Sequence, residues 1–323
     1  MKSIIVHFVA GLALGLGAQV QAADTYPEKP IRLVVGQSPG SATDNIARAL
    51  AEHMSGELKQ SVIVVNQPGA GGGVAATAVA RERADGYSVM FATVSQLSLN
   101  PWFYESLAYE PFKDFTYIAP VADVPMLLVA SRASGIRDFA DFVRKAKASP
   151  GTLNYSSWGA GTASHLSMEM IAILTGVSLT HIPYKGTAPA LASIFSGETD
   201  VNVTVLGSGI PAVRGDQVVP LALLQPRRDS RLPDTPTLRE LGVEAPEFPS
   251  WIGMVGPAGL PQPITDTLAK ALGKAISDPA IQQRFNQLAL IPLHGDGAQL
   301  MHKAKSDSNI WGKLIQDRGI TLE

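Results

Sequence analysis

The chain has 323 residues, of which 46% are hydrophobic and 17% are charged, and its formal net charge at pH 7 is −2. This length and apolar content suffice for one large or two medium domains with substantial cores. The chain has no basic patch interleaved with aromatic residues, which argues against nucleic-acid binding. It has no cysteine, which excludes disulfides, thiolate catalysis, cysteine-ligated zinc and iron–sulfur clusters.

The N-terminus has the layout of a secretory signal peptide. Lys2 precedes an apolar stretch from Ile4 to Val20, and small residues follow it up to Ala22. A membrane anchor is the alternative, but the segment is short and rich in glycine, and it ends in a plausible cleavage site. We therefore predict that residues 1–22 are a signal peptide and that the mature protein is periplasmic.

In the first part of the mature chain, β-branched apolar runs alternate with helix-like stretches. The predicted strands are Ile31–Val35, Val62–Val65, Ser88–Thr93 and Phe115–Ala122, and the predicted helices are Ala42–Lys59 and Val74–Arg83. This alternation is typical of a parallel sheet with crossover helices. The stretch Asn100–Lys113 is aromatic and interrupted by prolines, so we predict an irregular segment.

A second α/β unit follows. Its predicted strands are Met126–Ala130, Leu153–Ser156, Leu179–Ile182, Val201–Val205 and Val218–Leu224, and its predicted helices are Phe139–Ala148, Ser164–Thr175 and Ala188–Phe195. A proline-rich connector, Pro226–Pro249, is predicted to carry one short helix at Thr237–Leu241. After it we predict a strand at Trp251–Val255 and helices at Ile264–Ser277, Ala280–Gln287 and Ala298–Asp317.

This last stretch has too few strands to form a third domain, so we expect it to return to the first unit. The prediction is therefore an α/β protein with two lobes and two crossings, near Asp123–Met126 and Ser250–Val255. Residues 23–123 and 252–323 are assigned to lobe 1 and residues 124–251 to lobe 2. Ligands of open α/β sheets bind outside the carboxyl ends of the strands, which places the site in the cleft between the lobes.

Two strand-to-helix loops, Gly36–Thr43 and Ser156–Ser164, are rich in glycine and hydroxyl groups. Such loops present backbone N–H groups at the positive end of a helix dipole, which favours an anion. Neither loop contains Lys or Arg. We therefore expect N–H groups and hydroxyls to neutralise the ligand, helped by roughly half a positive charge at each helix N-terminus.

The first loop also matches G-x-S-x-G between a strand and a helix, the context of a hydrolase nucleophile. That elbow belongs in mid-sheet, whereas this loop follows the first strand of the mature chain. Pro39 moreover lacks the N–H that the oxyanion hole needs. An exported serine hydrolase using Ser38 is the alternative function, and ester hydrolysis abolished by Ser38→Ala would be its evidence.

Other candidate sites are weaker. The glycines of Gly69–Gly73 lack the third glycine of a dinucleotide fingerprint, because Val74 occupies its position, and they predict a tight turn at the cleft rim. Asp44 lies in a first helical turn, where its charge suits the helix dipole, and Ser41 and Thr43 are candidate N-caps. The histidines lack metal-ligand spacing, so no metal or cofactor is predicted, and His165 is expected to bond locally.

Several motifs are similar to those of one family. They include Tyr26–Ile31 (YPEKPI), Val65–Gly72 (VNQPGAGG), His181–Leu191 (HIPYKGTAPAL) and Leu232–Thr237 (LPDTPT). Along essentially the whole mature chain, the sequence resembles the solute receptors of tripartite tricarboxylate transporters, the Bug or TctC-like proteins. The resemblance implies a two-lobed periplasmic binding protein of the Venus-flytrap, type II-like class. It implies a non-enzymatic receptor whose partners are permease subunits of the membrane transporter or a sensor kinase, and we expect a monomer.

The resemblance also implies that the two loops bind a small carboxylate. Three departures from the family pattern refine this: Ser41 replaces a glycine, the strand at Val201–Val205 lacks an acidic residue, and Trp158 replaces a small residue. They disfavour a ligand with a distal amine and favour an aromatic or otherwise flat acid, with a dicarboxylate also open. The expected ligand-binding residues are Gly36, Gln37, Ser38, Pro39, Gly40, Ser41, Ala42, Thr43, Asp44, Ser95, Ser156, Ser157, Trp158, Gly159, Ala160, Gly161, Thr162, Ala163, Ser164, His165 and Thr204.

Overall fold

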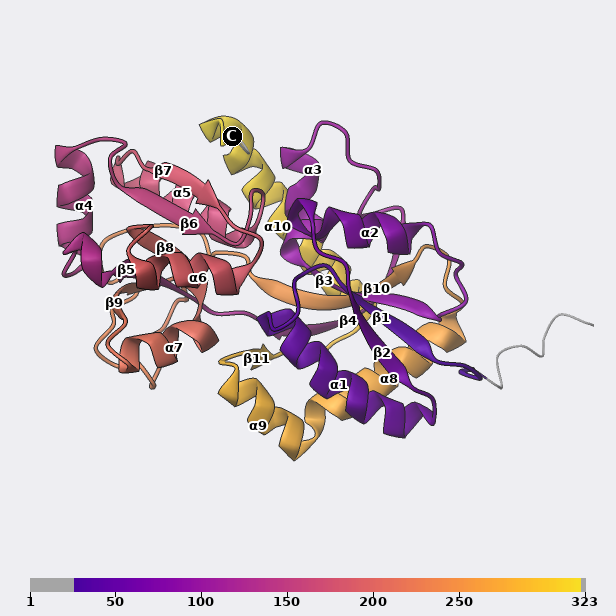
Figure 1. Cartoon of the computed structure of the whole chain (residues 1–323). Coiled ribbons are helices and arrows are strands. Elements are labelled where there is room, and N and C mark those ends of the chain that lie inside the picture. Colours follow the sequence, from indigo (N-terminus) through magenta and orange to yellow (C-terminus); the bar gives the residue numbers. More distant parts are fainter. Residues whose placement is uncertain (1–25, 321–323) are drawn as a thin grey trace, which may run out of the picture.

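The computed structural model describes residues 26–320, so the predicted signal peptide lies outside the described residues. The described part of the chain has no helix that is both long enough and apolar enough to cross a membrane. Its strands form two separate sheets, shown side by side in Figure 1.

The first sheet has the strand order β11-β4-β10-β3-β1-β2. Its strands are β1 (Ile31–Val35), β2 (Val62–Asn66), β3 (Ser88–Thr93), β4 (Phe115–Asp123), β10 (Trp251–Pro257) and β11 (Ile291–Pro292). Strand β1 pairs in parallel with β2 and β3, as the alternating sequence pattern predicts. Strand β10 returns from the second unit and inserts antiparallel between β3 and β4.

The second sheet has the strand order β7-β6-β8-β5-β9. Its strands are β5 (Met126–Ser131), β6 (Asn154–Ser157), β7 (Thr180–Pro183), β8 (Val201–Val205) and β9 (Val218–Leu223). Strand β6 is parallel to β7 and β8, whereas β5 runs antiparallel to β8 and β9. Both sheets are therefore mixed. In each sheet one strand next to a crossing, β10 in the first and β5 in the second, is antiparallel to its neighbours.

Helices cover both faces of each sheet. They are α1 (Ala42–Leu58), α2 (Gly73–Ala80), α3 (Asn100–Phe103), α4 (Phe139–Ala148), α5 (Ala163–Thr175), α6 (Thr187–Ser196), α7 (Leu206–Arg214), α8 (Gln262–Ser277), α9 (Pro279–Gln287) and α10 (Gly297–Arg318). Helices α1, α8 and α9 share one core with the first sheet, and α2 and α10 pack on its other face. In the second sheet α4 and α5 cover one face, and α6 and α7 cover the other.

The strands are buried on both faces, and their residues alternate between the two cores. In β5, Leu127 and Val129 join the core of α6 and α7, whereas Met126 and Leu128 face the core of α4 and α5. Side chains of a strand point alternately to opposite faces, so a continuous apolar run is what a doubly covered strand requires. This explains why short apolar runs predicted the strands although apolar and polar residues do not alternate within them.

The chain crosses between the sheets twice, and the two crossings are hydrogen-bonded to each other. The first lies between β4 and β5, and the second leads into β10. The Val124 N–H of the first crossing donates to the Ser250 carbonyl of the second at 2.7 Å. The Pro125 carbonyl of the first crossing accepts the N–H of Leu206, the first residue of α7, at 2.8 Å. The predicted two-lobed α/β fold with two crossings is confirmed.

Three local predictions are wrong. The stretch predicted to be irregular, Asn100–Lys113, begins with helix α3, since Pro101 sits in the first turn, where its missing N–H costs little. The predicted helix Thr237–Leu241 is a turn. Helix α7 was missed because its sequence contains two glycines and Pro211, and packing of Leu206 and Ile210 against the second sheet compensates for that weak propensity.

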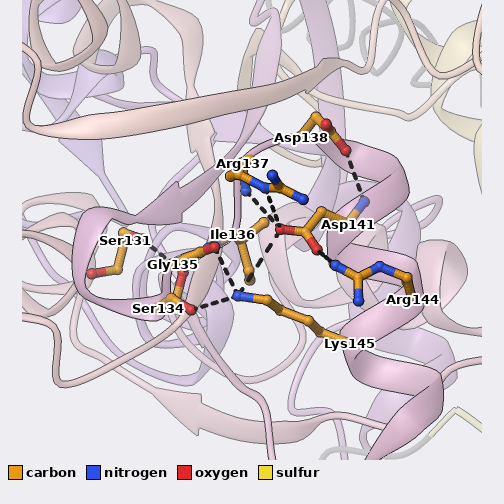
Figure 2. A network of polar contacts seen from close by, with 9 residues as sticks. All are labelled: Ser131, Ser134, Gly135, Ile136, Arg137, Asp138, Asp141, Arg144 and Lys145. Atoms are coloured by element: carbon orange, nitrogen blue, oxygen red, sulfur yellow. Dashed lines mark hydrogen bonds and ion pairs between the residues drawn. The ribbon is translucent and has the colours of Figure 1, made fainter.

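Away from the crossings, a polar network around Asp141 ties α4 to the turn that precedes it (Figure 2). The Asp141 carboxylate accepts the Arg137 N–H at 3.1 Å and pairs with Arg144. Lys145 donates to the Gly135 carbonyl at 2.7 Å. Burial would raise the pKa of Asp141, but the Arg137 N–H and the neighbouring cations outweigh it and lower that pKa. The network is a structural anchor on the outer side of lobe 2.

The contact between α10 and β4 gives a test of this packing. A Cβ at Gly297 would lie 2.0 Å from the Tyr117 carbonyl oxygen, whereas one at Gly273 in α8 has nothing within 4 Å. Gly297→Ala should therefore lower the free energy of unfolding by about 1–3 kcal/mol through overpacking. Gly273→Ala should raise it by about 0.4–1 kcal/mol, because alanine restricts the unfolded chain. Urea denaturation checks both, and equal shifts for the two variants would contradict the packing described.

Candidate ligand-binding site

A cavity of about 610 Å³ lies between the two lobes. Lobe 1 contributes the loop before α1, the glycine turn before α2 and the end of β3. Lobe 2 contributes the loops before α5 and α6 and the end of β8. The lining residues are Gly36, Gln37, Ser38, Ser41, Ala42, Thr43, Pro68, Gly69, Ala70, Gly71, Gly72, Thr93, Val94, Ser95, Tyr104, Val124, Trp158, Gly159, Ala160, Thr162, Ala163, Tyr184, Lys185, Gly186, Thr187, Val205, Ser250 and Trp251.

The loop before α1 is held in shape by Asp44. The Asp44 carboxylate accepts the Gly40 N–H at 2.8 Å and the Asn66 amide at 2.9 Å, and it pairs with Arg48 at 2.9 Å. Burial would raise the pKa of Asp44, but these bonds, led by the one from Arg48, lower it. Asp44 is 2% exposed and does not line the cavity, so its structural role is to fix the loop. Ser41 is the N-cap and accepts the Asp44 N–H at 3.1 Å.

The glycine turn before α2 depends on Gln96. The Gln96 side chain donates to the Gly71 carbonyl at 2.9 Å and accepts the Thr93 N–H at 2.6 Å. Gly72 has φ +85°, and a Cβ there would overlap the Gln96 amide. The sequence placed this turn at the cleft rim without including it among the site residues, and the structure brings it to the cavity wall.

The loop before α5 is also fixed by side chains that do not reach the cavity. Ser156 donates to the Ala190 carbonyl at 3.1 Å, and Ser164 donates to the Val203 carbonyl at 2.7 Å. Both serines are fully buried. Of the expected binding residues, those that do not line the cavity are Pro39, Gly40, Asp44, Ser156, Ser157, Gly161, Ser164, His165 and Thr204.

Behind this loop lies a stack of three aromatic rings. The His165 ring lies 4.2 Å from that of His181, which lies 4.7 Å from that of Tyr155. His165 Nδ1 accepts the Gly161 N–H at 3.3 Å, as expected for a locally bonded histidine, and His181 Nε2 lies 2.7 Å from Ser157 Oγ. Burial lowers the pKa of His165 to about 3, with a further contribution from His181, and burial lowers the pKa of His181 to about 4. Both rings are therefore neutral at physiological pH.

The helices that begin at the cavity lack side-chain caps, apart from α1. No side chain caps the first N–H groups of α2, α5, α6 or α7. Of the helices that begin elsewhere, α4, α9 and α10 are capped by Asp138, Asp278 and Asp296, whereas α3 and α8 have no side-chain cap. Each N-terminus carries roughly half a positive charge. Of these four helices, α5 and α6 begin with residues that line the cavity, so two helix starts without side-chain caps lie where a ligand would bind.

Charged side chains are nearly absent from the lining. Among the described residues no Asp or Glu lines the cavity, and Lys185 is the one Lys or Arg in the lining. Lys185 is exposed, immediately before the N-cap of α6. The expectation that the two loops act without a cation overlooked this lysine, since the HIPYKG motif was used as a mark of the family alone. It lay outside both loops in sequence, and only the fold brings it to the cavity.

The lobes are in direct contact at the cavity mouth. The Ser38 hydroxyl donates to the Lys185 carbonyl at 3.1 Å, across the cleft from one lobe to the other. Trp158, in the loop before α5, is half-buried and packs against two of the hydrophobic cores. Its indole Nε1 is buried and has no hydrogen-bond partner within residues 26–320. The cleft is thus closed around the cavity by contacts from both sides.

A two-lobed fold with a cavity at its crossings defines the class of two-domain solute-binding proteins. Residues 46–320 match the family described as tripartite tricarboxylate transporter family receptor, and the chain belongs to that family. A curated relative from Cupriavidus necator, the UPF0065 protein in the gbd 5′ region, is 34% identical over 326 residues, covering 97% of this chain and 98% of that protein. The resemblance seen in the sequence motifs is confirmed.

Solved structures agree. Periplasmic binding protein BugD is 34% identical, with a TM-score of 0.87, over 92% of this chain and 99% of that chain. Rpa4515 of R. palustris, solved with adipate, is 29% identical, with a TM-score of 0.87, over 92% and 99% of the two chains. MatC of Rhodopseudomonas palustris, solved with bound malate, is 28% identical, with a TM-score of 0.84, over 90% and 100%.

The buried imidazoles predict an acid-sensitive fold. Their pKa values are lowered in the folded state from the ordinary 6.5, so below pH 6.5 the unfolded chain binds more protons. The free energy of unfolding should therefore decrease as the pH drops below 6.5, by about 1.4 kcal/mol per pH unit for each histidine, until the pH reaches the pKa of the folded state. Thermal melts between pH 7 and 5 should show this loss, and His165→Phe should weaken the dependence. His302→Gln, on an exposed part of α10, is the control, and an unchanged profile in His165→Phe would contradict the assignment.

Proposed function

We propose that this protein is a periplasmic receptor that captures a small organic carboxylate in the cavity between its lobes. The observation that carries the proposal is that α5 and α6 begin, without side-chain caps, at a cavity that no acidic side chain of the described residues lines. Backbone N–H groups at helix N-termini bind carboxylates, and hydrogen bonds to an ionised acceptor contribute about 1.5–3 kcal/mol each. The relatives solved with adipate and malate support the same ligand chemistry.

The proposed ligand-binding residues are the expected ones that line the cavity, together with lining residues that the sequence did not indicate. From the two loops these are Gly36, Gln37, Ser38, Ser41, Ala42, Thr43, Trp158, Gly159, Ala160, Thr162 and Ala163, with Ser95 from the end of β3. The additions are the glycine turn Gly69–Gly72 and the segment Tyr184–Thr187. Residues behind the loops, such as Asp44 and Ser164, act by positioning the backbone.

The serine hydrolase alternative lacks support in this geometry. The Ser38 hydroxyl donates to a backbone carbonyl, that of Lys185, rather than to a general base. The two buried imidazoles, those of His165 and His181, have local partners. Nucleophilic catalysis requires a base within hydrogen-bond reach of the nucleophile. We therefore propose a non-enzymatic binding protein.

We propose that a membrane partner recognises the protein when its two lobes are closed over the ligand, and that transport or signalling follows. Two lobes that close over a ligand present one combined surface to a membrane partner, and an open form would not. We propose that the protein acts as a monomer. Its membrane partner is the permease of a tripartite tricarboxylate transporter, or a sensor kinase if the protein signals. The family membership supports the permease.

A substitution that places a carboxylate side chain in the cavity tests whether the protein binds carboxylates there. Thr162 is the N-cap of α5, its hydroxyl donates to the Gly159 carbonyl, and it lines the cavity. Thr162→Asp would place a negative charge at this N-terminus. Two like charges about 4 Å apart repel by ~4 kcal/mol at an effective dielectric constant of 20. Affinity for any carboxylate should therefore fall at least about a hundredfold, which calorimetry with hexanoate, benzoate, adipate and malate would measure.

The matched control is Gln262→Asp at the start of α8. That helix also lacks a side-chain cap, but it begins outside the cavity. The control should keep wild-type affinity, because its charge lies away from the ligand. The function is refuted if the wild-type protein binds none of the four acids, or if Thr162→Asp binds them as tightly as the control does.

A further inference from the structure

We propose that the ligand is a monocarboxylate with an apolar body, and that the apolar floor of the cavity selects against a second carboxylate. This inference rests on the proposed function and names the substrate class of the same site. It also separates this protein from its relatives that were solved with adipate and malate.

The floor of the cavity consists of Val94, Val124, Val205 and Trp251. These residues follow β3, follow β4, end β8 and begin β10, so they meet where the two crossings lie. All four are buried, with exposures between 1% and 8%. Strand pairing and the bond between the crossings hold them in place, because Ile252 pairs with Thr93 and the Val124 N–H donates to Ser250.

The charged and more exposed part of the lining is at Lys185, in contrast to the buried floor. Helices α1, α5 and α6 begin there, and the exposed Lys185 and the contact between Ser38 and the Lys185 carbonyl also lie there. One carboxylate at this end would meet backbone N–H groups and the lysine charge together. A second carboxylate on the same carbon chain would be directed to the floor, away from that cation.

The floor offers a second carboxylate no charged partner. Its nearest polar groups are neutral hydroxyls, and that of Thr93 already donates to Gln96 at 2.7 Å. Helix α7 begins there, but its Leu206 N–H donates to the Pro125 carbonyl. A Cβ at Gly207 would lie 2.1 Å from the Leu288 carbonyl oxygen, so this helix start packs against backbone of lobe 1. Burying an ionised group without pairing is strongly unfavourable.

The groups behind Trp251 add to this selection. The indole N–H of Trp251 donates to Asp307 at 2.6 Å, so the ring has no donor left for a ligand. Asp123 lies opposite Trp251 in the sheet, and Lys303 Nζ is 3.5 Å from its carboxylate. Two carboxylates and one ammonium group therefore lie behind the floor, which does not attract an anion.

Aromatic side chains from both lobes complete an apolar wall. Tyr104 follows α3 in lobe 1, and Trp158 precedes α5 in lobe 2; both line the cavity. Flat rings bury large areas and pair favourably in offset or edge-to-face arrangements. The cavity of about 610 Å³ thus combines one anion-binding end with walls suited to an aryl or alkyl body.

The experiment compares matched acids on the full mature protein. Hexanoate and adipate have the same six-carbon chain and differ in a terminal methyl or carboxylate, and benzoate and terephthalate form an aromatic pair. Calorimetry should give hexanoate and benzoate at least about tenfold tighter binding than their diacid partners, which corresponds to about 1.4 kcal/mol. Equal affinity, or tighter binding of the diacids, would overturn the inference and leave the proposed function standing. Absence of binding by all four acids would instead refute the proposed function.

A floor variant provides the converse test. Val205→Lys would place a cation at the floor and should reverse the preference, so that adipate binds more tightly than hexanoate. Val74→Lys is the matched control, because Val74 is 50% exposed on α2 and lies outside the cavity lining. It should keep the wild-type order. A folded Val205→Lys protein that still prefers hexanoate would count against the floor as the determinant, and the wild-type comparison stands even if this variant does not fold.

Discussion

Helices α5 and α6 begin with residues that line the cavity, their first backbone N–H groups have no side-chain caps, and the rest of the site is arranged around them. Polar backbone groups need partners, and elsewhere in the chain Asp138, Asp278 and Asp296 supply them. At the cavity that role is left to a ligand. An anion is the ligand that such groups favour, since the helix dipoles add to the hydrogen bonds.

Such a site works only if the loops keep their shape, and buried side chains provide this rigidity. Asp44 holds the loop before α1, Gln96 holds the glycine turn, and Ser164 and His165 hold the loop before α5. None of these four residues lines the cavity. Preorganised donors bind without an ordering cost at the moment of binding, which is why a site can gain affinity from residues that never touch the ligand.

Much of the fold followed from pattern, because its strands are doubly buried and its helices amphipathic. The predicted boundaries of β1, β3 and α4 agree with the structure to the residue. Helix α7 did not follow from pattern, because its glycines and Pro211 hide a helix that depends on packing. The two glycine-rich loops join a strand to a helix, as the sequence pattern predicts. Whether a particular hydroxyl faces the cleft or the core was not available from spacing, as Ser156 and Ser164 show.

The sequence by itself indicated the family through its motifs. It indicated the two-lobed architecture and the two glycine-rich loops at helix starts because these depend on local propensity and periodicity. The tertiary structure decided which residues share the cavity. Lys185 and Trp251 come from distant parts of the chain, and only the closure of the lobes and the return of β10 bring them to the same space. The apolar floor exists for the same reason: Val94 and Val124 follow two strands and Val205 ends a third, and the two hydrogen-bonded crossings place them together.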